Sequence, residues 1–189
     1  MAQAKIIPSK SPCRPVGVYY FGNGKGKTTA ALGAVLRAAG YGRRVLVLQF
    51  IKGDWVTGEI QAIRRDFPDL VTIKQLGKGF VGIMGDKLPI SEHIHAAKSA
   101  LTEISSAIRS QMWDLIILDE LTDLITLRLV DENDVIQSIQ NYRDGQADII
   151  VTGHHCNPQI SKIMDIVTEM KKIKHHYDNG IIAKRGLDY

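Results

Sequence analysis

The sequence predicts a doubly wound α/β domain, in which a mostly parallel sheet carries helices on both faces. Short, almost wholly apolar runs alternate with segments of helical periodicity, as expected for strands that are buried on both faces. A glycine-rich loop joins the first apolar run to the first helical segment, and two acidic residues end a later run. The 189 residues are enough for one domain with a core of its own.

The expected strands and helices follow one another along the chain. The clear strands are the apolar runs 16–21, 45–50, 115–118 and 149–151, and the weaker ones are 71–76 and 172–174 with their neighbours. The expected helices are 28–39, 91–111, 135–142 and 159–167. In the longest of them, five apolar side chains fall on one helical stripe: Ile94, Ala97, Leu101, Ile104 and Ile108. The glycine-rich stretch 78–88 predicts a flexible loop.

The composition fits a single soluble domain over 16–189, preceded by a flexible arm over 1–15 that contains three prolines. Hydrophobic residues make up 44% and charged residues 23% of the chain, which is ordinary for a globular protein. No run approaches the roughly 18 apolar residues of a membrane span, and the arm lacks the apolar stretch of a secretory signal. We therefore expect a cytoplasmic protein with no membrane partner.

Positive charge is concentrated in the first quarter of the chain. Nine of the 24 lysines and arginines lie up to Lys52, and no acidic residue precedes Asp54. Such a segment attracts polyanions, which could be a nucleotide triphosphate or a nucleic acid. Few aromatic side chains are interleaved with these cations, so a nucleic-acid partner is not expected.

A phosphate-binding loop is predicted where the first strand meets the first helix. The loop sequence is Gly22-Asn23-Gly24-Lys25-Gly26-Lys27-Thr28-Thr29, and Phe21 occupies the first glycine position of the strict P-loop pattern. Glycines let backbone N–H groups face phosphate oxygens, and the helix N-terminus adds partial positive charge. We expect Lys27 to be a solvent-facing catalytic cation on the phosphates of ATP, with Lys25 as a second cation. The Thr28 hydroxyl can bind Mg²⁺.

Two acidic residues end the expected strand 115–118. Asp119 and Glu120 would lie at the carboxyl edge of the sheet, where open α/β folds bind ligands. One of the two carboxylates can hold Mg²⁺ opposite Thr28, directly or through water. Together with the loop, this pair predicts a Mg²⁺–ATP site in a P-loop domain of the RecA-like type.

With these elements the chain resembles the P-loop type of corrinoid adenosyltransferase, the ATP:cob(I)alamin adenosyltransferase family. The resemblance covers nearly all of 16–189 and rests on several blocks: 22–33, Arg37-Ala38, Gln49-Phe50-Ile51-Lys52-Gly53, Gly58-Glu59, 118–122, Val151-Thr152-Gly153 and Gly186-Leu187-Asp188-Tyr189. It implies transfer of the 5′-adenosyl group of ATP to the Co(I) of a reduced corrinoid, with release of triphosphate. It also implies Mg²⁺, a homodimer and an electron-donor protein for Co(II). By matching positions, Arg37 and Glu59 become candidate ATP contacts.

The resemblance further assigns a corrinoid loop. The family carries Gly-Phe followed two residues later by Trp, and these aromatic side chains crowd the lower face of cobalt. Gly79-Phe80 matches, but Gly82 occupies the tryptophan position. The candidate corrinoid contacts are therefore Phe80, Ile83 and Met84, and Phe80 has the catalytic task of expelling the lower cobalt ligand.

Two other functions fit parts of the sequence. The P-loop with Asp119 and Glu120 also permits a small kinase or NTPase, which would release phosphate or ADP instead of triphosphate. A RecA-like nucleic-acid module has only the basic first quarter in its favour. Adjacent histidines do not predict zinc, although His154 and His155 follow a strand end, where polar contact with a ligand is available.

Overall fold

The structure is a computed structural model that describes residues 14–51, 53, 57–79, 81–82 and 86–188. Its centre is a six-stranded sheet with the order β3-β2-β4-β5-β1-β6, in which every pair is parallel. The strands are β1 (Gly17–Phe21), β2 (Val45–Gln49), β3 (Val71–Gln75), β4 (Leu115–Asp119), β5 (Asp148–Gly153) and β6 (Ile166–Glu169). This arrangement confirms the predicted fold class. The predicted arm over 1–15 lies almost wholly outside the described residues.

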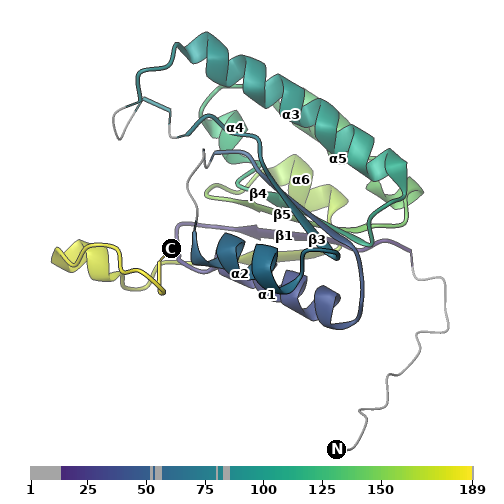
Figure 1. Cartoon of the computed structure of the whole chain (residues 1–189). Coiled ribbons are helices and arrows are strands. Elements are labelled where there is room, and N and C mark those ends of the chain that lie inside the picture. Colours follow the sequence, from purple (N-terminus) through teal and green to yellow (C-terminus); the bar gives the residue numbers. More distant parts are fainter. Residues whose placement is uncertain (1–13, 52, 54–56, 80, 83–85, 189) are drawn as a thin grey trace, which may run out of the picture.

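Helices cover both faces of this sheet (Figure 1). The helices α1 (Lys27–Gly40) and α2 (Gly58–Asp66) lie on one face. The other face carries α3 (Ile90–Ser110), α4 (Asp123–Thr126), α5 (Glu132–Ile139) and α6 (Pro158–Ile163). Two short 3₁₀ turns are η1 (Tyr142–Asp144) and η2 (His176–Asn179). None of the helices described here is both long and apolar enough to cross a membrane.

The sheet separates two apolar cores. Side chains alternate along each strand, so each central strand contributes to both cores. In β2, Leu46 and Leu48 pack with the core beside α3 and α5. Val45 and Val47 pack with the core beside α1 and α2. Because successive side chains of a strand point to opposite faces, a strand buried on both sides needs an unbroken apolar run. This requirement explains why the four clear runs in the sequence all form strands.

The C-terminal part of the chain differs from the prediction. The helix expected over 159–167 ends at Ile163 as α6, and the strand expected around 172–174 is instead β6, Ile166–Glu169. Ile160, Ile163 and Val167 fit a helical spacing, but backbone pairing with β1 in the register Val18↔Ile166 prevails. All four β6 side chains are exposed, so this edge strand has no apolar pattern that could mark it. The short helices α2 and α4 were not predicted.

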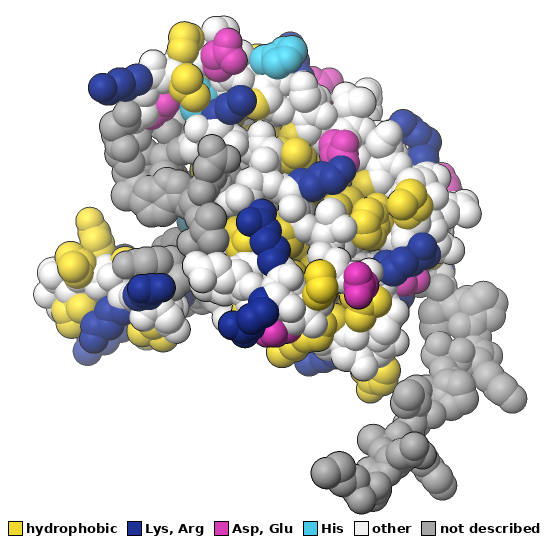
Figure 2. All heavy atoms as spheres, in the orientation of Figure 1, with side chains coloured by type: hydrophobic (Ala, Val, Ile, Leu, Met, Phe, Trp, Pro, Cys, Tyr) yellow, Lys and Arg dark blue, Asp and Glu magenta, His cyan; other side chains and the backbone are white. Residues whose placement is uncertain are grey.

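Charged side chains do not form one continuous basic patch on the face seen in Figure 2. Lysine and arginine side chains lie there among acidic and apolar ones (Figure 2). On this face the described positive charges are therefore interspersed with negative ones.

The amino edge of the sheet is held by Asp165. Its carboxylate accepts hydrogen bonds from the Gly17 N–H at 2.9 Å and the Tyr142 hydroxyl at 2.8 Å. Arg14 and Arg143 each donate to the same carboxylate at 2.9 Å. The Gly17 hydrogen bond is the largest of the effects that lower the pKa of Asp165 to about 2, and burial raises the pKa of Tyr142 to about 12. Because Asp165 directly precedes β6, its carboxylate joins the start of this strand to the start of β1 and to η1.

Replacing Asp165 by asparagine should destabilise the fold in a pH-dependent way. The pKa of Asp165 is about 2 in the folded protein and 3.8 ordinarily. The ionised carboxylate therefore stabilises the fold fully at pH values above 3.8, and this stabilisation is lost as pH falls through the folded pKa of about 2. We expect Asp165→Asn to lower the free energy of unfolding by about 1 kcal/mol near neutral pH, a value discounted for solvent screening. Urea unfolding over a pH series measures it.

The exposed Asp144 of η1 supplies the control, because Asp144→Asn removes the same charge from the same edge of the sheet. This variant should leave the free energy of unfolding nearly unchanged. A difference between Asp165→Asn and the wild type that stays constant as pH falls would contradict the assignment of the low pKa to these hydrogen bonds.

Candidate functional site

The loop predicted to bind phosphate connects β1 to α1 and is shaped by three glycines. Gly22 and Gly26 have φ angles of 120° and 116°, a region that residues with a Cβ rarely adopt. The N–H of Gly22 donates to the Gly153 carbonyl at 3.2 Å, and the N–H of Gly24 donates to the Met170 carbonyl at 2.6 Å. These two amides therefore anchor the loop to the end of β5 and to the residue after β6. They are not available to donate to phosphate, contrary to what the sequence predicts for the loop glycines.

Phe21 fits at the start of this loop because it is still part of β1. Its carbonyl accepts a hydrogen bond from the Met170 N–H at 2.7 Å. Its ring lies beside that of Tyr19, with 5.3 Å between the ring centroids. The side chain thus packs next to the core, and the bend that a strict P-loop begins with its first glycine begins here at Gly22.

Lys27 is buried, so the expectation of a solvent-facing lysine is wrong. Its ammonium donates to the Gly22 carbonyl at 2.7 Å and to the Gly24 carbonyl at 2.9 Å. Burial lowers the pKa of this ammonium. The side chain therefore bridges the loop from inside while it also lines the neighbouring cavity.

Asp119 connects the loop helix to the sheet. Its side chain is 1% exposed, and its Oδ1 atom accepts from the hydroxyls of Thr28 at 2.8 Å and Thr152 at 2.9 Å. Its Oδ2 atom accepts from the Gln49 amide at 3.1 Å. The structure thus brings Thr28 and Asp119, both predicted from sequence, into direct contact.

Glu120 turns away from this buried network. Its φ angle is 64°, an uncommon value for a residue other than glycine. The turn is held by its N–H, which donates to the Thr152 hydroxyl at 2.8 Å. As a result the Glu120 side chain lines the cavity while Asp119 stays within the protein.

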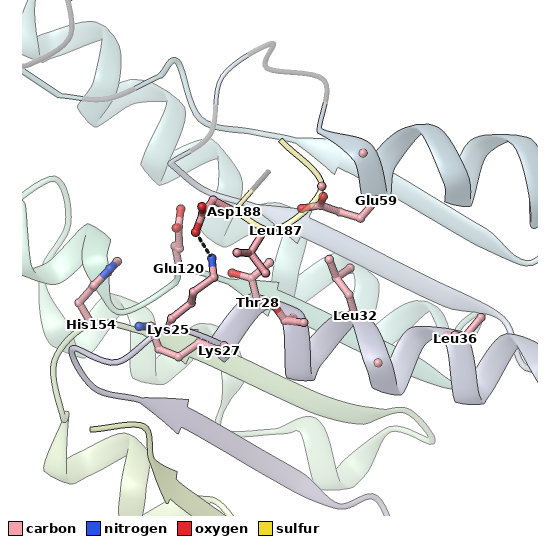
Figure 3. A pocket seen from close by; sticks show the side chains of 15 residues that line it. Lys25, Lys27, Thr28, Leu32, Leu36, Glu59, Glu120, His154, Leu187 and Asp188 are labelled. Atoms are coloured by element: carbon pink, nitrogen blue, oxygen red, sulfur yellow. Dashed lines mark ion pairs between the residues drawn. The ribbon is translucent and has the colours of Figure 1, made fainter. Parts of the chain in front are cut away.

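These elements surround a cavity of about 730 Å³ (Figure 3). We call it the P-loop cavity. The lining residues come from five parts of the chain: the loop and start of α1 (25–29), the outer face of α1 (Leu32, Gly33, Leu36), the start of α2 (Gly58, Glu59), the residues that follow β4 and β5 (Glu120, His154), and the segment 186–188. Its polar end holds Lys25, Lys27, Glu120, His154 and Asp188, and its apolar end lies along α1 at Leu32 and Leu36, with Glu59 nearer this second end.

One wall of the cavity was not foreseen from the sequence. The Lys25 ammonium lies 2.6 Å from the Asp188 carboxylate, and this carboxylate also accepts from the Lys184 N–H at 2.7 Å. The Lys184 hydrogen bond is the largest of the effects that lower the pKa of Asp188. In addition, the Lys172 N–H donates to the Asn23 side chain at 2.9 Å. The chain after β6 therefore contacts the loop through Lys172 and Asp188.

Comparison with known proteins identifies the family. Residues 14–189 match the sequence model of the family described as ATP:corrinoid adenosyltransferase BtuR/CobO/CobP. The chain belongs to this family. A corrinoid adenosyltransferase of Escherichia coli strain K12 is 34% identical over 176 residues, which cover 93% of this chain and 86% of that protein. The corrinoid adenosyltransferase CobA of Salmonella typhimurium is also 34% identical, and one from Pseudomonas aeruginosa is 35% identical, with 93% of this chain covered in both.

The other site residues that the sequence predicts for this adenosyltransferase do not all lie at the P-loop cavity. Glu59 lines the P-loop cavity. Arg37 does not, because it lies in the last turn of α1 and lines a separate groove with Val16, Tyr41 and Arg43. Phe80, Ile83 and Met84 lie outside the described residues.

Described neighbours show how the expected corrinoid loop is attached. The Asp86 carboxylate accepts from the N–H groups of Gly82 at 2.8 Å and Leu88 at 3.0 Å. The ring of His93, buried in α3, lies 3.1 Å from the same carboxylate. One carboxylate therefore connects the middle and the end of the loop to a long helix of this adenosyltransferase.

The oxygen atoms at the polar end suit a hard cation that also binds phosphate. Within the described residues no group of three or more His, Cys, Asp or Glu side chains could hold a metal by itself. The Thr28 hydroxyl gives its hydrogen to Asp119, which leaves its oxygen lone pairs available. Mg²⁺ is typically bound by one or two protein oxygens with the rest from phosphate and water, and Thr28 with Glu120 fits that pattern.

Gly24→Ala tests how closely the loop of the adenosyltransferase is packed. An added Cβ would lie 2.6 Å from the Met170 carbonyl oxygen and 2.8 Å from the Lys171 carbonyl carbon, so two backbone segments would have to separate. We expect the free energy of unfolding to fall by about 1–3 kcal/mol and ATP affinity to fall with it. Urea unfolding and calorimetric ATP titration measure the two effects.

Gly40→Ala, at the end of the same α1 helix, is the matched control, because no atom beyond its chain neighbours and its own helix backbone lies within 4 Å of the added Cβ. That variant should be as stable as the wild type or slightly more stable, since alanine favours a helix. Equal behaviour of the two variants would show that the contact between Gly24 and Met170 does not shape the site.

Proposed function

We propose that this chain transfers the 5′-adenosyl group of ATP to the Co(I) of a reduced corrinoid, releasing triphosphate, in adenosylcobalamin synthesis or salvage. The family match over residues 14–189 supports this reaction. The observation that carries the proposal is the P-loop cavity, which places two lysines, a helix N-terminus and three acidic residues around one space large enough for a nucleotide.

The reaction requires little acid–base catalysis by the protein. Co(I) attacks C5′ of the ribose, the Co–C bond forms as the C5′–O bond breaks, and the electron pair leaves with triphosphate. Because Co(I) is already a strong nucleophile, no general base is required. The protein must orient two substrates and stabilise negative charge on the leaving group. Lys25, Lys27 and the N-terminus of α1 can provide that stabilisation.

Mg²⁺ is part of this proposal. The Thr28 hydroxyl and the Glu120 carboxylate would hold it, while Asp119 would orient Thr28 through the hydrogen bond of 2.8 Å. When bound, the cation supplies positive charge to the triphosphate.

Glu120→Gln should raise the Mg²⁺ concentration needed for half-maximal rate several-fold, because one formal charge that faces the metal is lost. The assay follows adenosylation against Mg²⁺ at fixed ATP. Glu59→Gln is the control, since it removes the same charge from another side of the same cavity (Figure 3). This control should leave the Mg²⁺ requirement unchanged. If Glu120→Gln leaves the Mg²⁺ titration unchanged, Glu120 does not hold the metal and Asp119 becomes the candidate ligand.

The corrinoid would bind at the loop that contains Phe80, Ile83 and Met84. By resemblance, an aromatic ring pressed against the lower face of cobalt displaces the lower ligand and makes Co(II) easier to reduce. Gly82 stands where the family has tryptophan, so Phe80 carries more of this task. An electron-donor protein and a homodimer belong to the same proposal and rest on the resemblance.

Phe80→Ala should therefore separate two assays. Activity should fall severely when Co(II) must be reduced on the enzyme, and it should largely persist when Co(I) is supplied ready-made. The KM for ATP should stay constant, because the phosphates bind elsewhere. The measurement is the rate of formation of the light-sensitive Co–C product under both conditions. Equal losses in the two assays would show that Phe80 contributes packing alone.

The test of the whole proposal is the identity of the phosphate product. The wild-type protein is incubated with ATP, Mg²⁺ and chemically reduced corrinoid, and the released species are separated by ion exchange. Stoichiometric triphosphate and alkylated corrinoid are expected. Phosphate or ADP without alkylated corrinoid would replace the transferase by a kinase or NTPase.

A further inference from the structure

His154 is held by one carboxylate at two points. It directly follows β5, and its backbone N–H donates to Asp123 Oδ1 at 2.9 Å while its ring Nδ1 lies 2.7 Å from Asp123 Oδ2. Asp123 is 7% exposed and belongs to the first turn of α4. Both the backbone and the ring of His154 are thus fixed to a buried anion at the carboxyl edge of the sheet.

This clamp determines which ring nitrogen faces a ligand. A carboxylate only accepts hydrogen bonds, so Nδ1 carries a hydrogen and Nε2 is the nitrogen that remains. Nε2 makes no hydrogen bond to any part of the chain that the structure describes. The side chain is 54% exposed and lines the P-loop cavity on the same side as Lys25, Lys27 and Glu120 (Figure 3).

We propose that His154 is a phosphate-binding residue whose Nε2–H, oriented by Asp123, donates a hydrogen bond to the triphosphate of ATP. The inference rests on the proposed function for the identity of the ligand and adds a third cationic group beside the two loop lysines. Negative charge on the triphosphate grows as the C5′–O bond breaks, so this contact strengthens toward the transition state.

The surroundings favour the charged imidazolium. The hydrogen bond to Asp123 is the largest of the effects that raise the pKa of His154 above its ordinary 6.5, and the charges of Asp123 and Glu120 act in the same direction. Burial and the nearby Lys27 oppose them. Lys25 and Asp188, which line the same cavity, neutralise each other as an ion pair. His154 therefore keeps its proton, and with it a hydrogen on Nε2, to a higher pH than a free histidine.

The neighbouring His155 provides a matched control. Its backbone carbonyl accepts a hydrogen bond from the Tyr19 hydroxyl at 2.6 Å, but its side chain is exposed and does not line the cavity. The two adjacent residues thus have the same side chain but differ in whether it lines the P-loop cavity.

The experiment measures binding of inorganic triphosphate by calorimetry to the wild type, His154→Ala and His155→Ala over a pH series. At about pH 6 we expect His154→Ala to weaken binding about ten-fold, as for a partly exposed charge-assisted hydrogen bond. His155→Ala should bind like the wild type. The ratio of the two dissociation constants cancels the titration of triphosphate itself.

The pH dependence of that ratio tests the charge. Only the protonated ring donates from Nε2, so its contribution to binding is complete below the pKa of His154 in the unliganded protein and is lost as pH rises through the higher pKa of the complex. The ratio of the His154→Ala dissociation constant to that of the wild type should therefore fall toward one as pH rises into the alkaline range. Asp123→Asn, which keeps the shape but removes the charge, should move this decline to lower pH.

The outcomes separate this inference from the proposed function. Wild-type triphosphate binding at low pH in His154→Ala, a ratio that does not change with pH, or an equal loss in His155→Ala would each overturn the role of His154. Failure of the wild type to alkylate a corrinoid would instead overturn the reaction, since triphosphate binding is measured without it. In the working enzyme, His154→Ala should lower kcat with ready-made Co(I) and leave the KM for corrinoid unchanged.

Discussion

The site depends on one buried carboxylate, that of Asp119. In the parallel register Gln49 lies directly opposite Asp119 on the neighbouring strand, and Thr152 belongs to the strand on the other side. Both donate to Asp119, and Thr28 donates from α1. A buried anion is strongly destabilising when it loses its hydrogen-bond donors, so these contacts set the position of α1 on the sheet. The lysines of the loop, the turn at Glu120 and the floor of the P-loop cavity all follow from that position.

Sequence alone predicted the parts of the fold that obey strong local rules. Strands buried on both faces need continuous apolar runs, and the loop sequence needs glycines where φ is positive, so β1, β2, β4, β5 and the P-loop were all recognisable. The contact between Thr28 and Asp119 could be anticipated. Thr28 follows β1 through the loop, Asp119 ends β4, and the carboxyl ends of parallel strands lie at the same edge of a sheet. The edge strand β6 could not, since its exposed side chains carry no burial pattern and only backbone pairing with β1 defines it.

Other features depend on long-range contacts that no local pattern encodes. Lys27 was expected to face solvent, but its ammonium is drawn inward by two carbonyl groups that converge only when the loop closes. Asp123 and His154 are separated by a strand and two helices in the chain, so their contact was invisible, although the position of His154 after a strand end was an available signal. Arg37 matches a family block, yet the length of α1 places it at the far end of the helix from the loop.

The contact of Lys25 with Asp188 bears on how the enzyme is made. Residues 186–188 supply one wall of the P-loop cavity, and they follow every strand of the sheet along the chain. During synthesis on the ribosome, all six strands and the phosphate loop are therefore made before this wall. A nascent chain that contains every strand still lacks one wall of its substrate pocket, and the pocket is complete only after residues 186–188 have been made.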